Sequence, residues 1–412
     1  MRESPYPEIP YDEALAAVLA VVRSLAPARL PIEAAHGLVL AEALLAAEPM
    51  PPFAAAAKDG YAVRSADGAG PHRLAGAVTA GQPLMAAGVM LAPGTAVRIT
   101  TGAAVPDGAD AVAMVEEVDE VEWEGAPAIQ LRRPVAAHEH VRPVGEDFPA
   151  GAVLLEAGTR LGAAELGLAA GAGSGSVAVY PRPRVAIFST GDELVAPGAS
   201  AAPGQIRDSN RFTLAAAARE AGAEVGTAGT LRDRAEDVAR LAEAIRTHDA
   251  VVTSGGVSMG ERDLIKPWLA EHGRIVFGRV RIKPGKPMTL AVVDGTPVFA
   301  LPGFPVSSLV CFELFVRPAL RRLAGITNVA RPVWPVRLEH RVAHALDRTE
   351  FVRAQVRMGA DGTPIAASTG AQGSGRLLSM AGANALLRMP EGGQGWVGDG
   401  EVVQAVVVGE VY

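Results

Sequence analysis

The chain has 412 residues, 49% of them hydrophobic and 20% charged, so it is long enough for two to four domains with cores of their own. Its 38 basic and 45 acidic residues give a net charge of −7, which argues against a general nucleic-acid-binding protein. The single cysteine, Cys311, excludes intrachain disulfides and thiolate metal sites. The sequence has no signal-peptide pattern and no apolar run of about 18 residues, which predicts a cytoplasmic protein without a membrane span.

The first 180 residues change character twice along the chain. Apolar residues recur at helical spacing over Tyr11–Ser24, and Asp12 is placed to cap that helix. Between residues 46 and 145, short β-like runs alternate with Gly and Pro turns, which predicts an inserted β-rich domain. The flanking residues 1–45 and 146–180, with a predicted helix at Gly162–Ala170, are expected to form one mixed domain.

Residues 181–328 alternate between strands and helices. Strands are predicted at Val185–Ser189, Glu224–Leu231, Ala250–Thr253, Ile275–Ile282, Met288–Val293 and Val298–Leu301, and a long apolar helix at Pro305–Leu323. This alternation predicts a doubly wound, mostly parallel sheet at the centre of a multidomain α/β protein. Residues 329–412 contain short β-like runs, which predict a small β-barrel.

The loops that follow these strands carry glycines, carboxylates and lysines, and ligands of open α/β sheets bind at the carboxyl ends of strands. In the loop Ser254–Gly260, backbone N–H groups can hold an anion, and the candidate contacts are Ser254, Gly255, Gly256, Ser258 and Gly260. Positive charge and a second glycine turn come from Lys283, Lys286, Pro302 and Gly303. Hard oxygen ligands suited to Mg²⁺ come from Glu193, Asp233 and Asp263. The residues therefore predict a site for a phosphorylated or oxyanionic small molecule with Mg²⁺.

Three other features have ordinary structural explanations. His138-Glu139-His140 places two imidazoles together, but a solvated turn is favoured over a metal site because no third ligand is near in sequence. Cys311 lies in an apolar helix and is expected in the core. Lys58-Asp59-Gly60-Tyr61 is compatible with a plain turn.

Motifs along nearly the whole chain resemble the MoeA family of molybdopterin molybdenumtransferases. The resemblance rests on runs that occur in the family's order, namely Asp59–Val63, Gly81–Pro83, Arg98–Ala103, Arg142–Asp147, Gly191–Leu194, Gly204–Asn210, Ser254–Gly260, Lys283–Pro287, Pro302–Ser307 and Gly373–Gly375. The resemblance implies a MogA-like central domain, an elongated four-domain subunit and a homodimer with a shared active site. It also implies a reaction in which molybdate and adenylylated molybdopterin give the molybdenum cofactor and AMP with Mg²⁺.

The resemblance assigns roles to individual residues. The family's functional acids fall on Asp59, Asp147, Glu193, Asp233 and Asp263, and further functional positions match Arg142, Lys283 and Ser374. The acids are implied in Mg²⁺ binding and adenylate hydrolysis, and Lys283 with the glycine-rich loop in contacts to phosphate, pterin or molybdate. A molybdopterin adenylyltransferase and molybdoenzyme apoproteins are the implied partners.

The chain departs from the family pattern at a few positions. Ala54–Ala57 replaces a polar stretch, Lys58 replaces an apolar residue, and Arg279 stands where a lysine is usual. Two alternatives remain open at this point: a molybdopterin adenylyltransferase, and a catalytically weakened scaffold paralogue.

Overall fold

The computed structural model describes residues 5–81, 90–232, 234–256 and 265–411. The chain divides into two compact units, one of Met1–Ala28 with Val179–Tyr412 and one of Arg29–Ala178. Helix α1, which the sequence analysis groups with residues 29–45, instead packs its buried Ala14 and Val18 into the core of the first unit. Within the described ranges, no helix is both long and apolar enough to cross a membrane.

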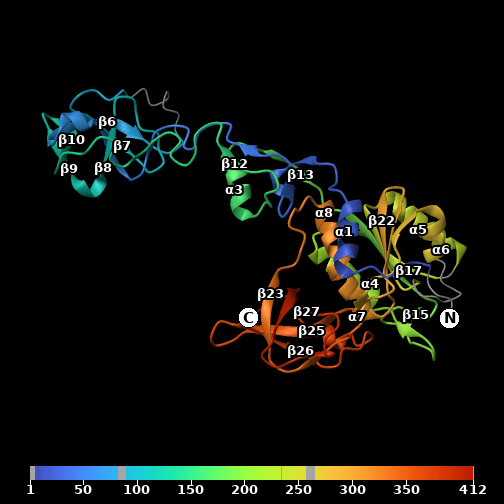
Figure 1. Cartoon of the computed structure of the whole chain (residues 1–412). Helices are drawn as coiled ribbons and strands as arrows, with labels where there is room; N and C mark the ends of the chain where they lie inside the picture. The colour runs from blue at the N-terminus through green and yellow to red at the C-terminus, as the bar shows by residue number, and fades with distance from the viewer. Residues whose placement is uncertain (1–4, 82–89, 233, 257–264, 412) are drawn as a thin grey trace. The chain divides into compact units, whose positions relative to one another are not determined.

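The first unit is built on a six-stranded sheet (Figure 1). In spatial order its strands are β17 (Glu224–Leu231), β14 (Arg184–Thr190), β18 (Ala250–Ser254), β22 (Thr296–Leu301), β21 (Thr289–Val293) and β19 (Arg274–Phe277). The first four are parallel, whereas β21 runs antiparallel to both β22 and β19. The predicted doubly wound, mostly parallel sheet is therefore confirmed.

Helices cover both faces of this sheet. One face carries α1 (Tyr11–Val21), α4 (Asn210–Glu220), α7 (Pro305–Cys311) and α8 (Arg317–Leu323), and the other carries α5 (Ala235–Thr247) and α6 (Ile265–His272). Because both faces are buried, neighbouring residues of one strand serve opposite cores: Val185 and Ile187 face the first set of helices, and Ala186 and Phe188 face the second. The predicted helix Pro305–Leu323 is interrupted by a π-helical stretch at Phe312–Val316, just before Pro318, whose ring nitrogen has no hydrogen to donate.

Two local predictions in this unit are wrong. The strand predicted at Ile275–Ile282 ends at Phe277, and Ile282–Lys283 forms a separate short strand, β20. The chain bends at Gly278, and the next residues bond to Ile9: Ile9 N donates to Arg279 O, and Arg281 N donates to Ile9 O. Asp12 does not cap α1, since Pro10 occupies the capping position. The Asp12 carboxylate instead accepts a hydrogen bond from Arg388, with Nη2 to Oδ2 at 2.5 Å.

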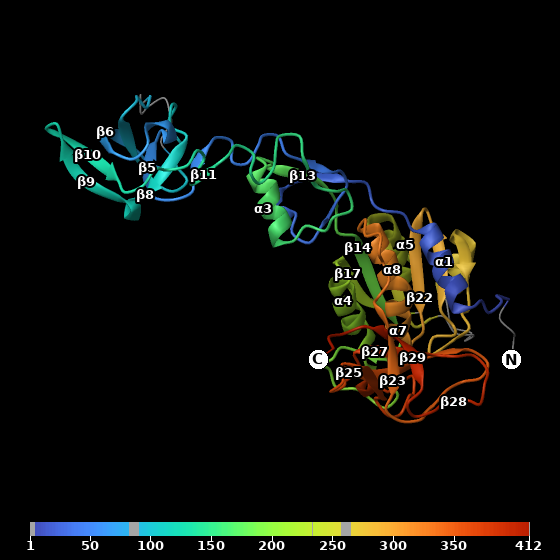
Figure 2. The same cartoon turned by 60° about the vertical axis from the view of Figure 1, so that its left-hand side comes forward.

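The C-terminal part of the first unit is a closed barrel of five strands. These are β25 (Thr349–Met358), β26 (Pro364–Ser368), β23 (Val333–Leu338), β29 (Val402–Val407) and β27 (Ala385–Met389), and the pairing of β25 with β27 closes the ring. A two-stranded ribbon joins β24 (Val342–Ala343) to β28 (Trp396–Val397). Figures 1 and 2 both place α7 beside the barrel, in agreement with the 3.0 Å hydrogen bond from Val306 N to Ser374 O. The predicted C-terminal β-barrel is confirmed.

Strand β20 (Ile282–Lys283) links the two parts of the first unit. It comes from the loop between β19 and β21, yet it pairs in parallel with barrel strand β25, with Lys283 opposite Glu350. Residues from the α/β domain and from the barrel therefore meet along one seam.

The second unit contains the predicted inserted β-rich region. Its main sheet has the order β8 (Ala111–Met114), β5 (Gly60–Val63), β7 (Thr95–Ile99), β6 (Pro71–Val78), β10 (Ala126–Leu131) and β9 (Val118–Trp123). Smaller pairings join β4 (Ala55–Ala56) to β11 (Val141–Arg142), β3 (Leu44–Leu45) to β12 (Val153–Leu155), and β1 (Ala28–Pro31) and β2 (Val39–Leu40) to β13 (Ser176–Tyr180). Helix α3 (Ala163–Gly171) matches its predicted position within one residue.

Candidate active site

The carboxyl ends of the parallel strands meet at one edge of the main sheet, where a single hydroxyl ties the loops together. The Ser254 hydroxyl donates to Pro302 O at 3.1 Å and accepts from the Asn210 amide at 2.8 Å and the Ser308 hydroxyl at 2.9 Å. Asn210 Nδ2 also donates to Gly303 O at 2.8 Å. The loops after β18 and β22 and the start of α4 are therefore locked to one another.

The Ser254 hydroxyl has a structural role. Ser254 is 2% exposed and the hydrogen-bonding capacity of its hydroxyl is used within the protein, so the side chain supports the loop. The anion contact predicted for the backbone of this loop stays a prediction. Gly255 N donates to Leu301 O at 3.0 Å, and Gly255 and Gly303 are packed so closely that a Cβ on Gly303 would lie 3.5 Å from the Gly255 Cα. Bare backbone forms the surface at this point.

A buried carboxylate links the strand ends at the same edge of the sheet through hydrogen bonds. Asp208 is 3% exposed and accepts hydrogen bonds from the Ser189 hydroxyl at 2.8 Å, the Thr230 hydroxyl at 3.3 Å and Arg211 N at 3.1 Å. The ends of β14 and β17 and the first turn of α4 are fixed by this one side chain. Neither Asp208 nor Asn210 was among the site residues predicted from the sequence.

A cavity of 690 Å³ opens between the loops of the α/β domain and the barrel. It brings together residues that are far apart in the sequence, including the predicted Lys283, Lys286, Pro302 and Ser374. Arg348, which the sequence analysis did not select, also lines it. The cavity carries three cationic side chains, each paired with a carboxylate, of Glu350, Glu8 or Asp347, and it is also lined by Ser307 and Ser374. An anionic ligand can bind here by sharing these cations with their carboxylate partners.

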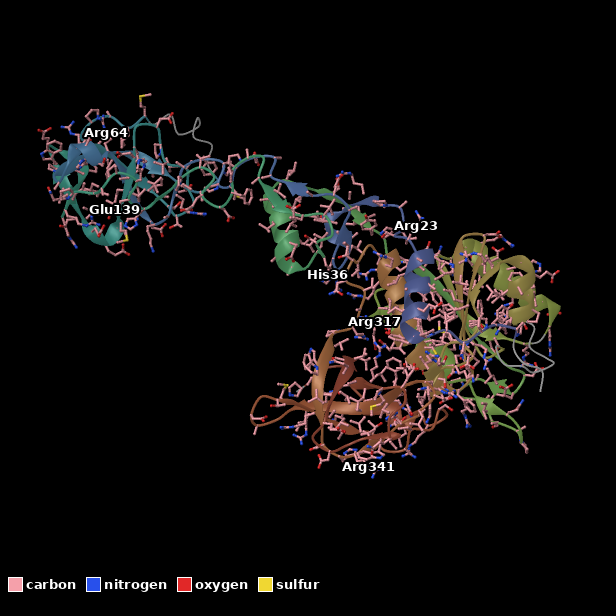
Figure 3. All side chains as sticks on the ribbon, in the orientation of Figure 1. Arg23, His36, Arg64, Glu139, Arg317 and Arg341 are labelled. Carbon is pink, nitrogen blue, oxygen red and sulfur yellow. The ribbon has the colours of Figure 1, made fainter. Side chains whose placement is uncertain are left out.

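Lys283 is held by a buried acid from the barrel. Its Nζ lies 3.2 Å from Glu350 Oε1, and the Glu350 side chain is 2% exposed whereas that of Lys283 is 49% exposed. The second Glu350 oxygen accepts a 2.6 Å hydrogen bond from Ala345 N. Lys283 and Glu350 also line a neighbouring cavity of 340 Å³, together with Arg341 of the barrel, which is labelled in Figure 3. Lys283 thus stands where two cavities adjoin.

Lys286 and Arg279 share a different acid. Lys286 Nζ lies 2.6 Å from Glu8 Oε1, and Arg279 forms an ion pair with the same oxygen. Burial raises the pKa of Glu8, but the Lys286 hydrogen bond and the charge of Arg279 outweigh burial, so the net pKa is below its ordinary value. Arg279, one of the departures from the family pattern, therefore has a defined partner in this chain.

Ser374 lies on a loop supported by a buried arginine. Arg353 of β25 is fully buried, and it donates to Gly373 O and to the Ser379 hydroxyl, each at 3.2 Å. Burial lowers the pKa of Arg353, and the charge of Glu350 opposes that shift. An arginine within the apolar run Phe351–Val356 was a sequence signal that could have identified this residue.

Glu193, the described member of the predicted Mg²⁺ ligands, lies in the turn after β14. Its carboxylate folds back over Gly191, where a Cβ would lie 2.5 Å from Glu193 Oε2. Within the described ranges the carboxylate is exposed and forms no ion pair, so it is accessible to a cation. The predicted residues Asp233, Ser258, Gly260 and Asp263 lie outside the described residues.

The remaining predicted residues lie in the second unit. Asp59 Oδ1 accepts from Thr101 N at 2.7 Å and from the Thr101 hydroxyl at 3.0 Å, and these bonds hold the pKa of Asp59 below its ordinary value. Arg142 pairs with Ala55 across β4 and β11, and its guanidinium donates to Glu146. Asp147 is exposed, and its backbone N–H donates to Met50 O at 2.9 Å.

The alanine run that departs from the family pattern is structural. Ala55 and Ala56 are 4% and 1% exposed and form β4. Ala56 N donates to Ala103 O at 2.9 Å, and its carbonyl accepts from Gly102 N at 2.8 Å. The run therefore connects the Arg142 segment to the Thr101 loop through its backbone.

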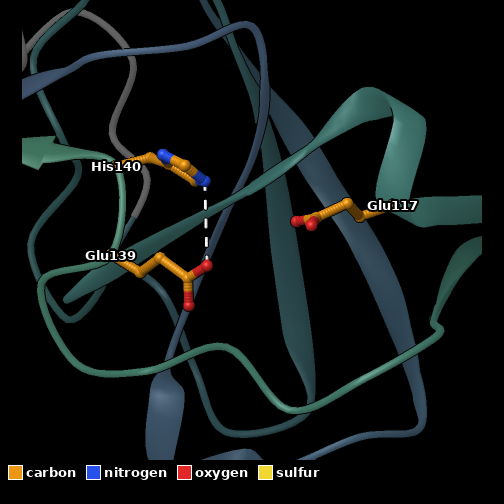
Figure 4. A group of neighbouring side chains, drawn as sticks. All are labelled: Glu117, Glu139 and His140. Carbon is orange, nitrogen blue, oxygen red and sulfur yellow. Dashed lines mark ion pairs between the residues drawn. The ribbon is translucent and has the colours of Figure 1, made fainter.

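A cluster of Glu117, Glu139 and His140 in the second unit has the spacing of a metal site (Figure 4). However, Arg133 donates hydrogen bonds to both glutamates, and its bond to Glu139, together with that of the Ala136 N–H, lowers the pKa of Glu139 to about 2. The guanidinium offsets one of the two carboxylate charges and occupies oxygens of both glutamates, which supports the ordinary structural explanation of His138-Glu139-His140. Cys311 is buried as predicted, and burial raises the pKa of its thiol.

Comparison with known proteins identifies the family. Family profiles match in chain order: the MoeA N-terminal region (domain I and II) over residues 9–173, a probable molybdopterin binding domain over residues 186–322, and the MoeA C-terminal region (domain IV) over residues 335–408. The chain belongs to the MoeA family. The family assignment made from the sequence motifs is confirmed.

Relatives of this MoeA-family chain match over most of its length. It is 38% identical over 392 residues to molybdopterin molybdenumtransferase 2 of Mycobacterium tuberculosis, a match that covers 91% of this chain and 93% of the relative. It is 35% identical over 460 residues to a gephyrin of Dictyostelium discoideum, and spans 64% of that protein. A crystal structure of the MoeA protein of Pyrococcus horikosii, 32% identical, superposes with a TM-score of 0.83 over 98% of this chain and 100% of that one.

Proposed function

We propose that this chain is a molybdopterin molybdenumtransferase, which transfers molybdenum from molybdate to adenylylated molybdopterin and releases AMP. The observation that carries the proposal is the 690 Å³ cavity, in which Lys283, Lys286 and Ser374 meet in a chain of the MoeA family. Relatives named molybdopterin molybdenumtransferase, 31–38% identical over most of the chain, confirm the predicted enzyme class.

The cavity residues bind and orient the anionic substrates in this proposal. Lys283, Lys286 and Arg348 carry positive charge into the cavity, and phosphate and molybdate are both oxyanions. Ser374 adds a hydroxyl on the loop that Arg353 supports, while Gly285 and Gly373 line the cavity with backbone that a substrate can approach closely. Fixing the reacting groups in this way lowers the entropic part of the barrier.

Glu193, Asp233 and Asp263 are the proposed Mg²⁺ ligands. Carboxylate oxygens are the donors that Mg²⁺ prefers, and the exposed Glu193 carboxylate fits this role. When bound, Mg²⁺ would supply charge neutralisation for the substrate phosphates. Asp59 and Asp147 are proposed as further catalytic acids and Arg142 as an anion contact, and all three are exposed in the second unit.

A symmetric homodimer with a shared site is part of the proposal. The support is that Asp59, Arg142 and Asp147 match functional positions of the family but belong to a different compact unit from Lys283 and Ser374. In a C₂ dimer each residue of one subunit has an equivalent in the other, so two complete sites can form from segments of both chains. We further propose a cytoplasmic location, with a molybdopterin adenylyltransferase and molybdoenzyme apoproteins as partners.

The direct test is to incubate the purified protein with adenylylated molybdopterin, Mg²⁺ and molybdate, and to measure AMP and active cofactor. Asp233→Ala and Asp263→Ala should each reduce AMP release while lowering the free energy of unfolding by no more than about 1 kcal/mol. Asp192→Ala, a change of an exposed neighbour of Glu193, is the matched control. Wild-type turnover in either test variant at saturating Mg²⁺ would contradict the assigned role. Pyrophosphate release from ATP and molybdopterin would favour the adenylyltransferase alternative.

Subunit mixing tests the shared site. Asp59→Ala and Lys283→Ala homodimers should each be inactive, but subunit exchange produces heterodimers with one intact site. Random exchange makes half of the dimers mixed, so activity should return to about a quarter of the wild-type value. An active monomer, or mixing that restores nothing although subunits exchange, would contradict the shared site.

A further inference from the structure

Phe304 is a solvent-exposed aromatic side chain at the rim of the cavity. It is 62% exposed, the highest value among the ten phenylalanines of the chain, of which only Phe53 at 40% and Phe212 at 51% are otherwise exposed. It lines the 690 Å³ cavity. Because burying an aromatic ring is strongly favourable, a ring left open beside a ligand cavity points to a partner that covers it.

Hydrogen bonds hold the backbone around Phe304. Phe304 immediately precedes α7, and its carbonyl accepts a 2.9 Å hydrogen bond from Ser308 N. Two residues later, Val306 N donates to Ser374 O at 3.0 Å. Both the loop that carries the ring and the loop opposite it are therefore held in place.

Gly375 is the residue across from the ring. A Cβ added to Gly375 would lie 3.5 Å from Cδ1 and 3.8 Å from Cε1 of Phe304, so a larger residue there would contact the ring. Because position 375 carries no side chain, it leaves the ring uncovered. The open face shares the cavity with Lys283, Lys286 and Arg348.

We propose that Phe304 is a stacking platform for a heteroaromatic ring of the substrate, either adenine or pterin. An aromatic face beside cationic side chains matches a ligand that joins a flat ring to a phosphate, and base stacking on an aromatic side chain strengthens binding by about 5- to 150-fold. This inference rests on the proposed function, because that reaction supplies a substrate with both rings. Phe304 is a specificity residue in this account, and the cations bind the phosphate or molybdate.

Equilibrium binding by calorimetry tests the platform with three probes: AMP, a simple pterin, and ribose 5-phosphate, which has the phosphate but no aromatic ring. Phe304→Ala and Phe304→Leu should each weaken binding of AMP or of the pterin about tenfold, and the weakened probe identifies the ring. Phe304→Tyr should bind like the wild type, because it keeps the aromatic face. Ribose 5-phosphate should bind equally to all variants.

Phe212→Ala is the matched control, since Phe212 is also exposed on the α/β domain but does not line the cavity. It should leave all three affinities unchanged. Unchanged affinity of Phe304→Ala for both ring probes overturns the platform, as does a wild-type protein that binds neither probe. Loss of dimer mass in Phe304→Ala with unchanged affinity overturns it too, and assigns the ring to a subunit contact.

Turnover measurements separate the platform from the proposed function. If the wild type releases AMP from the full substrate but ring binding does not depend on Phe304, the function stands and the platform fails. If ring binding depends on Phe304 but no AMP is released, the platform stands and the proposed function fails.

Discussion

Replacing Lys283 with methionine should destabilise the barrel, because the change leaves Glu350 buried without its cation. The Glu350 side chain is 2% exposed and lies 3.2 Å from Lys283 Nζ. Removing one partner of a fully buried pair costs about 3–5 kcal/mol, whereas exposed pairs are worth about 1 kcal/mol or less. Lys283 is 49% exposed, so water partly screens the pair, and we expect a loss of about 2 kcal/mol.

Urea unfolding followed by tryptophan fluorescence measures this loss. Trp334 and Trp396 lie in the barrel, and replacing Trp123 and Trp268 with phenylalanine leaves a signal from the barrel alone. In Lys283→Met/Glu350→Gln the uncompensated buried charge is gone, so about half of the lost stability should return. A double-mutant cycle with both single variants gives the coupling energy. If Lys283→Met is as stable as the wild type, or the coupling energy is below about 0.5 kcal/mol, the reasoning is refuted.

Three further substitutions and one labelling experiment have expected outcomes. Lys283→Arg should keep the fold but lower AMP release by up to about 10²-fold, because the planar guanidinium places a bound anion differently; unchanged kinetics would remove Lys283 from the site. Arg353→Met should leave the melting temperature nearly unchanged, since no charge is left unpaired. It should increase amide hydrogen exchange in the Gly373–Gly375 loop, because the hydrogen bond to Gly373 O is lost. Unaltered exchange would contradict the proposed support of this loop by Arg353. Thr101→Ala should raise the pKa of Asp59 only partly toward its ordinary value in an NMR titration, because the stronger hydrogen bond from the residue 101 backbone N–H remains. Because the pKa of Asp59 is lower in the folded protein than in the unfolded chain, its contribution to the free energy of unfolding is present above the unfolded pKa. That contribution is lost as the pH falls through the folded pKa. Cys311 should resist thiol reagents in the native protein and react fully in urea, and fast native labelling would show that its helix opens.

The α/β pattern was predictable because both faces of the main sheet are covered. Runs such as Val185–Phe188 are then apolar at every position, and the intervening helices carry one apolar stripe each. The sequence also placed the loops after the strands at one edge, which the hydrogen bonds around Ser254 confirm. Local periodicity is sufficient for these conclusions because the parallel connections leave little choice of topology.

The partners of the charged residues were not predictable in the same way. Lys283 meets Glu350 because of the register between β20 and β25, and a one-residue slip would point the acid away. Glu8 reaches Lys286 and Arg279 from a segment with no regular structure of its own. The strand predicted at Ile275–Ile282 was wrong for a related reason, since the backbone of Arg279 and Arg281 bonds to Ile9, a residue from the far end of the sequence.

The short strand β20 limits how this protein can be rearranged in evolution. The loop after β19 contributes one strand to the barrel and then returns to the α/β sheet as β21, so the barrel is not an interchangeable module attached by a tether. A recombination event that exchanged residues 329–412 for another small β domain would remove the partner strand of Ile282–Lys283 and the acid opposite Lys283. The two domains are therefore expected to be inherited together, and chimaeras joined in the 324–332 segment should tolerate only barrels that preserve the edge strand corresponding to β25.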